Sequence, residues 1–149
     1  MRILLTGCSG FIGQRLVDAL LADRHQLVCA VRHRQISSRP GLSYISVDFS
    51  KNTEKSAWLA RLVGIDAVIN TVGIFRETAG QTFAALHVAT PRALFAACAD
   101  TPGIALVVQV SALGADGDAT TAYHPSKQTA DDFLAALPVR SSIVQPSLV

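Results

Sequence analysis

The chain has 149 residues, of which 50% are hydrophobic and only 16% are charged, and its formal net charge is +2. This length suits one domain with a sizeable core, and so small a charge gives no reason to expect a nucleic acid or an acidic membrane surface as a partner. No apolar run reaches the roughly 18 residues of a membrane-spanning helix, so we expect no membrane segment.

The cysteines favour neither a disulfide framework nor a metal site. Cys8, Cys29 and Cys98 lie far apart in the sequence and lack C-x-x-C spacing, so we predict no zinc or other metal site. The chain opens directly into an apolar run, without the charged segment and cleavage site of a signal peptide. We therefore expect a cytoplasmic protein.

The first 22 residues contain a glycine motif between a predicted strand (2–6) and a predicted helix (11–22). Gly7 and Gly10 would let the backbone approach a pyrophosphate closely, and the free N–H groups at the helix N-terminus would point at that anion. Gly13 would let the helix pack close to the strand. The alternative is a tight corner without a ligand. The predicted cofactor contacts here are Gly7, Ser9, Gly10, Phe11, Ile12 and Gly13.

Strands and helices alternate along the remaining chain. This order predicts an α/β fold with a doubly wound parallel sheet in three layers, strand order 3-2-1-4-5-6 and a ligand crevice at the carboxyl ends of strands 1 and 4. The further predicted strands are 26–31, 43–47, 66–71, 104–110 and 139–145, and the further predicted helices are 54–62, 81–99 and one that ends near 137.

Pro91 interrupts the predicted helix over 81–99. It cannot donate the hydrogen bond to the carbonyl of His87 that a continuous helix requires. Either the helix bends there, or it restarts with Thr90 as its cap and Pro91 at its first position. We favour the bend.

The end of the second predicted strand would face the adenosine ribose of a dinucleotide. The chain places Arg32 there, with His33 and Arg34 behind it, and no acid before Asp48. Because a guanidinium can bind a 2′-phosphate through two hydrogen bonds, we predict NADP rather than NAD as the cofactor. The alternative is a solvated basic loop. Asp48 is either a turn residue or an acceptor for the adenine amino group.

Tyr123 and Lys127 form a Y-x-x-x-K pair on one face of the last predicted helix. The Lys127 ammonium, with the positive charge of an oxidised nicotinamide, would lower the pKa of the phenol, so that Tyr123 could act as acid or base during hydride transfer. Ser111, at the end of the fifth predicted strand, would donate a hydrogen bond to the same substrate oxygen. The alternative is a surface tyrosine beside a solvated lysine.

Together, the glycine loop Thr6–Gly13, Ser111, Tyr123 and Lys127 resemble the short-chain dehydrogenase/reductase superfamily, in its extended or atypical branches, over essentially the whole chain. The resemblance implies a Rossmann-like cofactor domain, a catalytic triad of Ser111, Tyr123 and Lys127, and cofactor contacts through the side chains of Tyr123 and Lys127 as well. Further contacts implied by the resemblance are Asp48, Phe49, Val72, Gly73 and Pro146.

Two further segments, 68–74 and 110–116, look like an atypical group related to the dinucleotide-binding accessory subunit of respiratory complex I and to predicted nucleoside-diphosphate-sugar epimerases. The last five residues resemble a family segment near the nicotinamide amide, with Gln145 in place of the usual arginine. His87 stands where relatives usually have asparagine; it could replace it in a proton relay, or be a core histidine satisfied by the backbone, which we favour. Pro125 would remove a helical hydrogen bond if its helix began at Thr121.

The resemblance implies a substrate-binding region beyond this point, so we expect residues 1–149 to correspond to a cofactor domain that is C-terminally truncated relative to the family. We therefore expect an NADP-dependent oxidoreductase or epimerase with an unidentified small-molecule substrate. The alternative functions are a non-catalytic NADPH-binding sensor or structural module, and a scaffold whose glycine loop is vestigial. The sheet edge after the sixth strand could pair with another chain, which allows a homo-oligomer.

Overall fold

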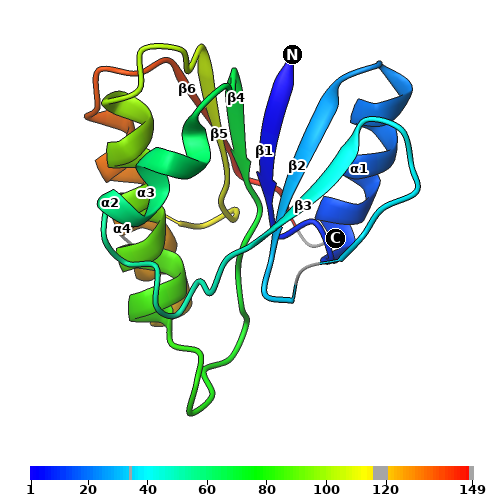
Figure 1. The fold of residues 1–149 in the computed structure, drawn as a ribbon. Coiled ribbons are helices and arrows are strands. Elements are labelled where there is room, and N and C mark those ends of the chain that lie inside the picture. The colour runs from blue at the N-terminus through cyan, green and yellow to red at the C-terminus, as the bar shows by residue number, and fades with distance from the viewer. Residues whose placement is uncertain (34, 116–120, 148–149) are drawn as a thin grey trace.

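A computed structural model describes residues 1–33, 35–115 and 121–147 (Figure 1). Arg34 of the basic cluster, 116–120 of the loop after the fifth strand and the last two residues of the C-terminal motif lie outside the described residues. No helix in these three ranges is both long and apolar enough to cross a membrane.

The centre of the molecule is a six-stranded sheet in the order β3-β2-β1-β4-β5-β6, with every neighbouring pair parallel. This confirms the predicted doubly wound topology. The central strand β1 pairs with β2 on one side and β4 on the other, so that Leu5 lies beside Cys29 and Ile69. The strands are β1 Arg2–Thr6, β2 Gln26–Val31, β3 Leu42–Ser46, β4 Ala67–Asn70, β5 Leu106–Val110 and β6 Ser141–Val144.

Helices cover both faces of the sheet and complete three layers. Figure 1 shows α1 on one face, with α2, α3 and α4 on the other. The helices are α1 Phe11–Ala22, α2 Ser56–Leu59, α3 Thr90–Ala99 and α4 Tyr123–Ala135; the short segments η1 Ala60–Leu62 and η2 Ala84–Ala89 are 3₁₀-helical and π-helical.

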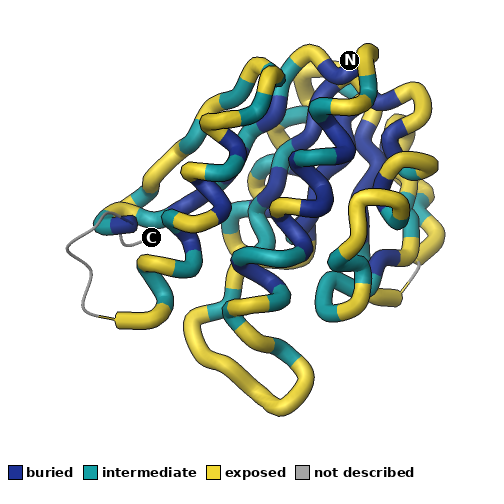
Figure 2. The backbone as a smooth tube through the Cα atoms, turned by 90° about the vertical axis from the view of Figure 1, so that its left-hand side faces the viewer, coloured by how far each residue is buried: buried dark blue, intermediate teal, exposed yellow. Residues whose placement is uncertain are grey.

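The core is divided by the sheet into two parts. The larger part packs under α2–α4 and contains the fully buried Trp58, Phe95 and Leu134, and the smaller part packs under α1 around Leu5 and Cys29. Figure 2 shows buried and exposed residues alternating along the helices. Because both faces of the central strands are covered, those strands are apolar at nearly every position.

Pro91 is accommodated by a wider helical segment. The π-helical turns of η2 precede it, and regular α-helix resumes at Thr90, so Pro91 stands in the first turn of α3. Thr90 has helical dihedral angles (φ −67°, ψ −46°), and its hydroxyl donates to the carbonyl of Phe49. The restart with Thr90 as cap is therefore wrong. Where we predicted a bend, the structure has the π-helical turns of η2. Such turns accommodate an interruption of the helical hydrogen-bond ladder like the one at Pro91.

Candidate functional site

The glycine loop between β1 and α1 is held in shape by two of its glycines. Gly7 has φ +74°, and a Cβ on it would lie 2.8 Å from the carbonyl carbon of Thr71 in the loop after β4. A Cβ on Gly13 would lie 2.7 Å from Cα of Cys8 and closer still to the carbonyl oxygen of Gly7. Gly13 therefore allows the start of α1 to pack against the loop that directly follows the strand.

This contact makes a stability prediction. We expect Gly13→Ala to lower the free energy of unfolding by about 2 kcal/mol, because the clash with the loop backbone exceeds the roughly 1 kcal/mol that alanine gains in helix propensity. Thermal unfolding should show a melting temperature lower by about 4–8 °C. Gly80→Ala is the matched control, because a Cβ there meets nothing within 4 Å. Equal melting temperatures for the two variants would contradict this role of Gly13.

Gly10 occupies the N-cap of α1 and leaves the helix end open. It makes no side-chain cap, and the first turn contains no acidic residue. A Cβ on Gly10 would meet only the carbonyl oxygen of Gly7, at 3.3 Å. The first N–H groups of α1 therefore face a space that no side chain of the loop fills, and the helix dipole makes that space favourable for an anion.

A pocket of about 340 Å³ lies above the ends of β1, β2 and β4, and we call it the glycine-loop pocket. It brings together predicted cofactor contacts from four separate stretches of sequence. Those that line it are Gly7, Ser9, Gly10, Arg32, Phe49, Val72 and Gly73.

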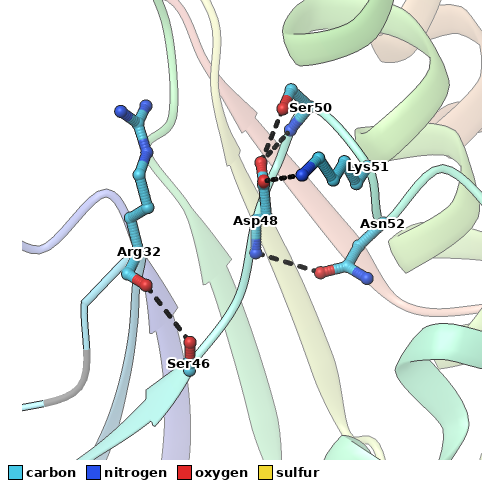
Figure 3. A network of polar contacts seen from close by, with 6 residues as sticks. All are labelled: Arg32, Ser46, Asp48, Ser50, Lys51 and Asn52. Atoms are coloured by element: carbon cyan, nitrogen blue, oxygen red, sulfur yellow. Dashed lines mark hydrogen bonds and ion pairs between the residues drawn. The ribbon is translucent and has the colours of Figure 1, made fainter.

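Arg32 and Asp48, which we predicted to contact the adenosine part of the cofactor, lie in different surroundings (Figure 3). The Arg32 side chain is exposed and stands clear of the other labelled residues, while its carbonyl accepts a bond from Ser46. The Asp48 carboxylate accepts bonds from the backbone N–H and the hydroxyl of Ser50, at 3.0 and 2.6 Å. The Ser50 hydroxyl lowers the pKa of Asp48. These contacts are those of a turn residue, one of the two predicted alternatives.

A second pocket, of about 300 Å³, lies over the ends of β5 and β6, and we call it the tyrosine pocket. Four predicted site residues line it, namely Ile12 from the first turn of α1, Ser111 after β5, Tyr123 from α4 and Pro146 after β6. The exposed ring of Phe75 is also part of its wall. The predicted catalytic residues Ser111 and Tyr123 therefore share a cavity.

Tyr123 begins α4 and lies among aromatic rings. Its ring stacks on Phe75 at 5.6 Å between centroids and meets the edge of His87 at 5.4 Å. Because α4 begins at Tyr123, Pro125 falls in its first turn, where the missing N–H costs no helical bond. Burial raises the pKa of the Tyr123 phenol, the direction opposite to the lowering predicted from Lys127.

Lys127 is buried one turn further along α4. Its Nζ donates to the carbonyl oxygen of Val110 at 3.0 Å and lies beside Gly73. Burial lowers the pKa of Lys127 to about 8, while Asp131 opposes that shift. The alternative of a solvated lysine is therefore wrong, although the ammonium contacts a strand carbonyl and not a phenolate.

The Ser111 hydroxyl donates its hydrogen bond to Asp131 on α4. It therefore presents a lone pair, not a proton, to the tyrosine pocket, which differs from the donor role that the sequence predicts. The reason is a buried carboxylate within reach that the sequence reasoning did not consider.

His87 lies in η2 and is almost fully buried. Its Nε2 accepts the N–H of Ile74 at 3.0 Å, and Nδ1 contacts the hydroxyl of Ser126 at 2.8 Å. Burial lowers the pKa of His87 to about 4, so the ring is neutral near pH 7, and an accepting Nε2 assigns the proton to Nδ1. The imidazole is thus satisfied by the backbone, as we expected, and by Ser126 in addition.

Four predicted site residues line neither pocket: Phe11, Gly13, Asp48 and Lys127. Phe11 is exposed, with the Arg15 guanidinium 3.7 Å above its ring. Sequence reasoning missed Gln109, Ser126 and Asp131. Two of them carried a signal: Gln109 interrupts an apolar strand, and Asp131 follows Lys127 by four positions on the same helical face.

Residues 3–137 match the model of the NAD dependent epimerase/dehydratase family. The chain belongs to this family. Membership agrees with the resemblance drawn from the glycine loop and the Tyr–Lys pair. A search of curated proteins found no match.

Several solved structures share the fold. The oxidoreductase ylbE of Lactococcus lactis superposes with a TM-score of 0.81 at 20% identity, over 98% of this chain and 68% of its own. WbmG of Bordetella bronchiseptica, in complex with NAD, gives 0.79 at 18% identity, over 97% and 52%. UDP-glucuronic acid 4-epimerase of Bacillus cereus, in complex with NAD, gives 0.75 at 18%, over 99% and 57%. The chain thus spans only about half the length of the last two.

Proposed function

We propose that this chain is the cofactor domain of an NADP-dependent oxidoreductase or epimerase. The pyrophosphate would lie on the N-terminus of α1, the adenosine half in the glycine-loop pocket and the nicotinamide in the tyrosine pocket. Tyr123 would exchange a proton with the substrate during hydride transfer, with Lys127 as its electrostatic partner and ribose ligand. When bound, the dinucleotide supplies the hydride acceptor or donor, and the substrate is a small molecule with a hydroxyl or carbonyl group.

One observation carries this proposal. Two pockets of about 340 and 300 Å³ lie over the carboxyl ends of the strands, with the uncapped start of α1 contributing to both through Gly10 and Ile12. A ligand with a planar heterocycle at each end and a diphosphate in the middle fits that arrangement. The residues present therefore suit a dinucleotide.

The choice of NADP rests on Arg32. Its exposed side chain lines the glycine-loop pocket at the end of β2, where the adenosine ribose would lie, and an acid in that place would favour NAD. WbmG and the Bacillus cereus epimerase were solved with NAD, so cofactor preference has to be measured for this chain.

We expect the chain to bind NADPH more tightly than NADH. Arg32→Ser should raise the dissociation constant for NADPH by about 10- to 30-fold, the loss of charge-assisted hydrogen bonds, and change that for NADH by less than about 2-fold. Fluorescence titration of the reduced nucleotides measures both constants. His33→Ser is the control, because His33 lines the same pocket. Tighter binding of NADH to the unmodified chain would contradict the NADP assignment.

The second candidate is a domain that binds NADPH without turnover. The raised pKa of Tyr123 and the contact of Lys127 with Val110 favour it, since neither prepares the phenol to lose a proton. Hydride transfer by the unmodified chain would exclude this candidate.

A further inference from the structure

A buried row of polar side chains crosses the middle of the sheet directly beneath the candidate site. Thr6, Asn70 and Gln109 are neighbours in register on β1, β4 and β5, and each is at most 1% exposed. The Thr6 hydroxyl donates to the amide oxygen of Asn70, and the Asn70 amide donates to that of Gln109 at 2.7 Å. Buried polar groups of this kind are costly unless they are paired, so the end of the row matters.

Asp131 on α4 is the buried acid next to this row. The Ser111 hydroxyl donates to its Oδ2. Burial raises the pKa of the Asp131 carboxyl group, while the side chains of Ser111 and Gln109 act in the opposite direction. Asp131 is 5% exposed, and its Oδ1 is buried without a hydrogen-bond partner among the described residues. The ionised form of Asp131 is disfavoured at this buried position, because burial raises the pKa of its carboxyl group. A merely structural position would be served better by an uncharged side chain.

Asp131 also acts on Lys127, one helical turn earlier. Its charge raises the pKa of Lys127 against the effect of burial, and the ammonium in turn lowers that of Asp131. The other titratable groups nearby are Tyr123 and Asp132 on α4 and the neutral His87 on η2, while Arg92 on α3 stacks over Phe133. Asp131 is thus the acid, among the described residues, whose charge acts on Lys127.

We propose that Asp131 is a positioning residue that holds the Ser111 hydroxyl beneath the tyrosine pocket and places a buried carboxylate one helical turn from Lys127. It accepts a hydrogen bond from the Ser111 hydroxyl, which leaves a serine lone pair for the pocket. Its negative charge favours the protonated form of Lys127, against the effect of burial. The functional meaning of this arrangement rests on the proposed function, but its existence can be tested without cofactor or substrate.

The test uses the small number of lysines in the chain. They are Lys51, Lys55 and Lys127, so lysine ¹³Cε resonances can be assigned from Lys→Arg variants and titrated by NMR. We expect Asp131→Asn to lower the pKa of Lys127 by about one unit and to leave Lys51 and Lys55 unchanged, since a neighbouring opposite charge is removed. Asp132→Asn is the matched control: it removes the same charge from the next, exposed position and should leave Lys127 within about 0.2 units.

A second measurement covers the case in which Asp131→Asn does not fold. Ser111→Ala should raise the pKa of the Asp131 carboxyl group, read from its ¹³Cγ resonance, because a hydrogen bond to the ionised form is lost. An unchanged Lys127 pKa in folded Asp131→Asn, or an unchanged Asp131 pKa in Ser111→Ala, overturns the proposal. Both readouts are independent of nucleotide, so failure to bind NADPH would count against the proposed function and leave this arrangement standing.

Discussion

Gly10→Glu should raise the dissociation constant for NADPH at least about 100-fold while leaving the fold intact. The new side chain would enter the space in front of the first N–H groups of α1, and its carboxylate would take the place of the diphosphate there. The melting temperature should fall only slightly, because the one close contact of a Cβ on Gly10 is the Gly7 carbonyl oxygen at 3.3 Å, and a shift of a few tenths of an ångström relieves it. Titration with NADPH and thermal unfolding together measure the two effects.

Gly80→Glu is the control for charge and for loss of glycine. Both positions are exposed, and nothing lies within 4 Å of a Cβ on Gly80. It should bind NADPH as the unmodified chain does. If Gly10→Glu also keeps full affinity, the nucleotide does not lie on the end of α1, and the loop serves only as a tight corner.

Tyr123→Phe should slow hydride transfer by about 10²- to 10⁴-fold, the usual contribution of a positioned acid or base, while NADPH affinity stays within about 3-fold. The phenylalanine keeps the stacking on Phe75 and removes only the hydroxyl. The measurement is single-turnover absorbance of the nicotinamide, with NADPH and carbonyl compounds in one direction and with NADP⁺ and hydroxyl compounds, including nucleoside-diphosphate sugars, in the other.

The other tyrosine of the chain provides the matched control. Tyr44 lies on β3, outside the tyrosine pocket, so Tyr44→Phe should leave the rate unchanged. Equal rates for Tyr123→Phe and the unmodified chain would remove Tyr123 from the chemistry. Tight NADPH binding without hydride transfer to any compound of the panel would favour the non-catalytic candidate.

The sequence predicted the architecture because the fold depends on repeated, local patterns. Apolar runs of strand length alternate with helical periodicity, and six strands in two βαβαβ halves match the order 3-2-1-4-5-6, with the glycine loop after the central first strand. The ends of elements were less predictable. The helix expected over 54–62 became α2 followed by the 3₁₀ turn η1, because packing around the buried Trp58 decides where each turn stops.

The candidate site was predictable where backbone geometry decides it. A positive φ at Gly7 and the close approach at Gly13 both require glycine, so the motif is readable from spacing alone. Side-chain partners were not readable in this way. Which group accepts the Ser111 hydrogen bond, and which carbonyl Lys127 binds, depends on how α4 packs near the end of β5, a contact between residues 17 to 20 positions apart.

The most direct test of the central claim is the structure of the chain with bound NADPH. The account predicts a diphosphate within about 3 Å of the backbone N–H groups of residues 11–13, with the 2′-phosphate beside Arg32. A crystal soaked with the nucleotide that shows a protein side chain in this crevice and no ligand would contradict it.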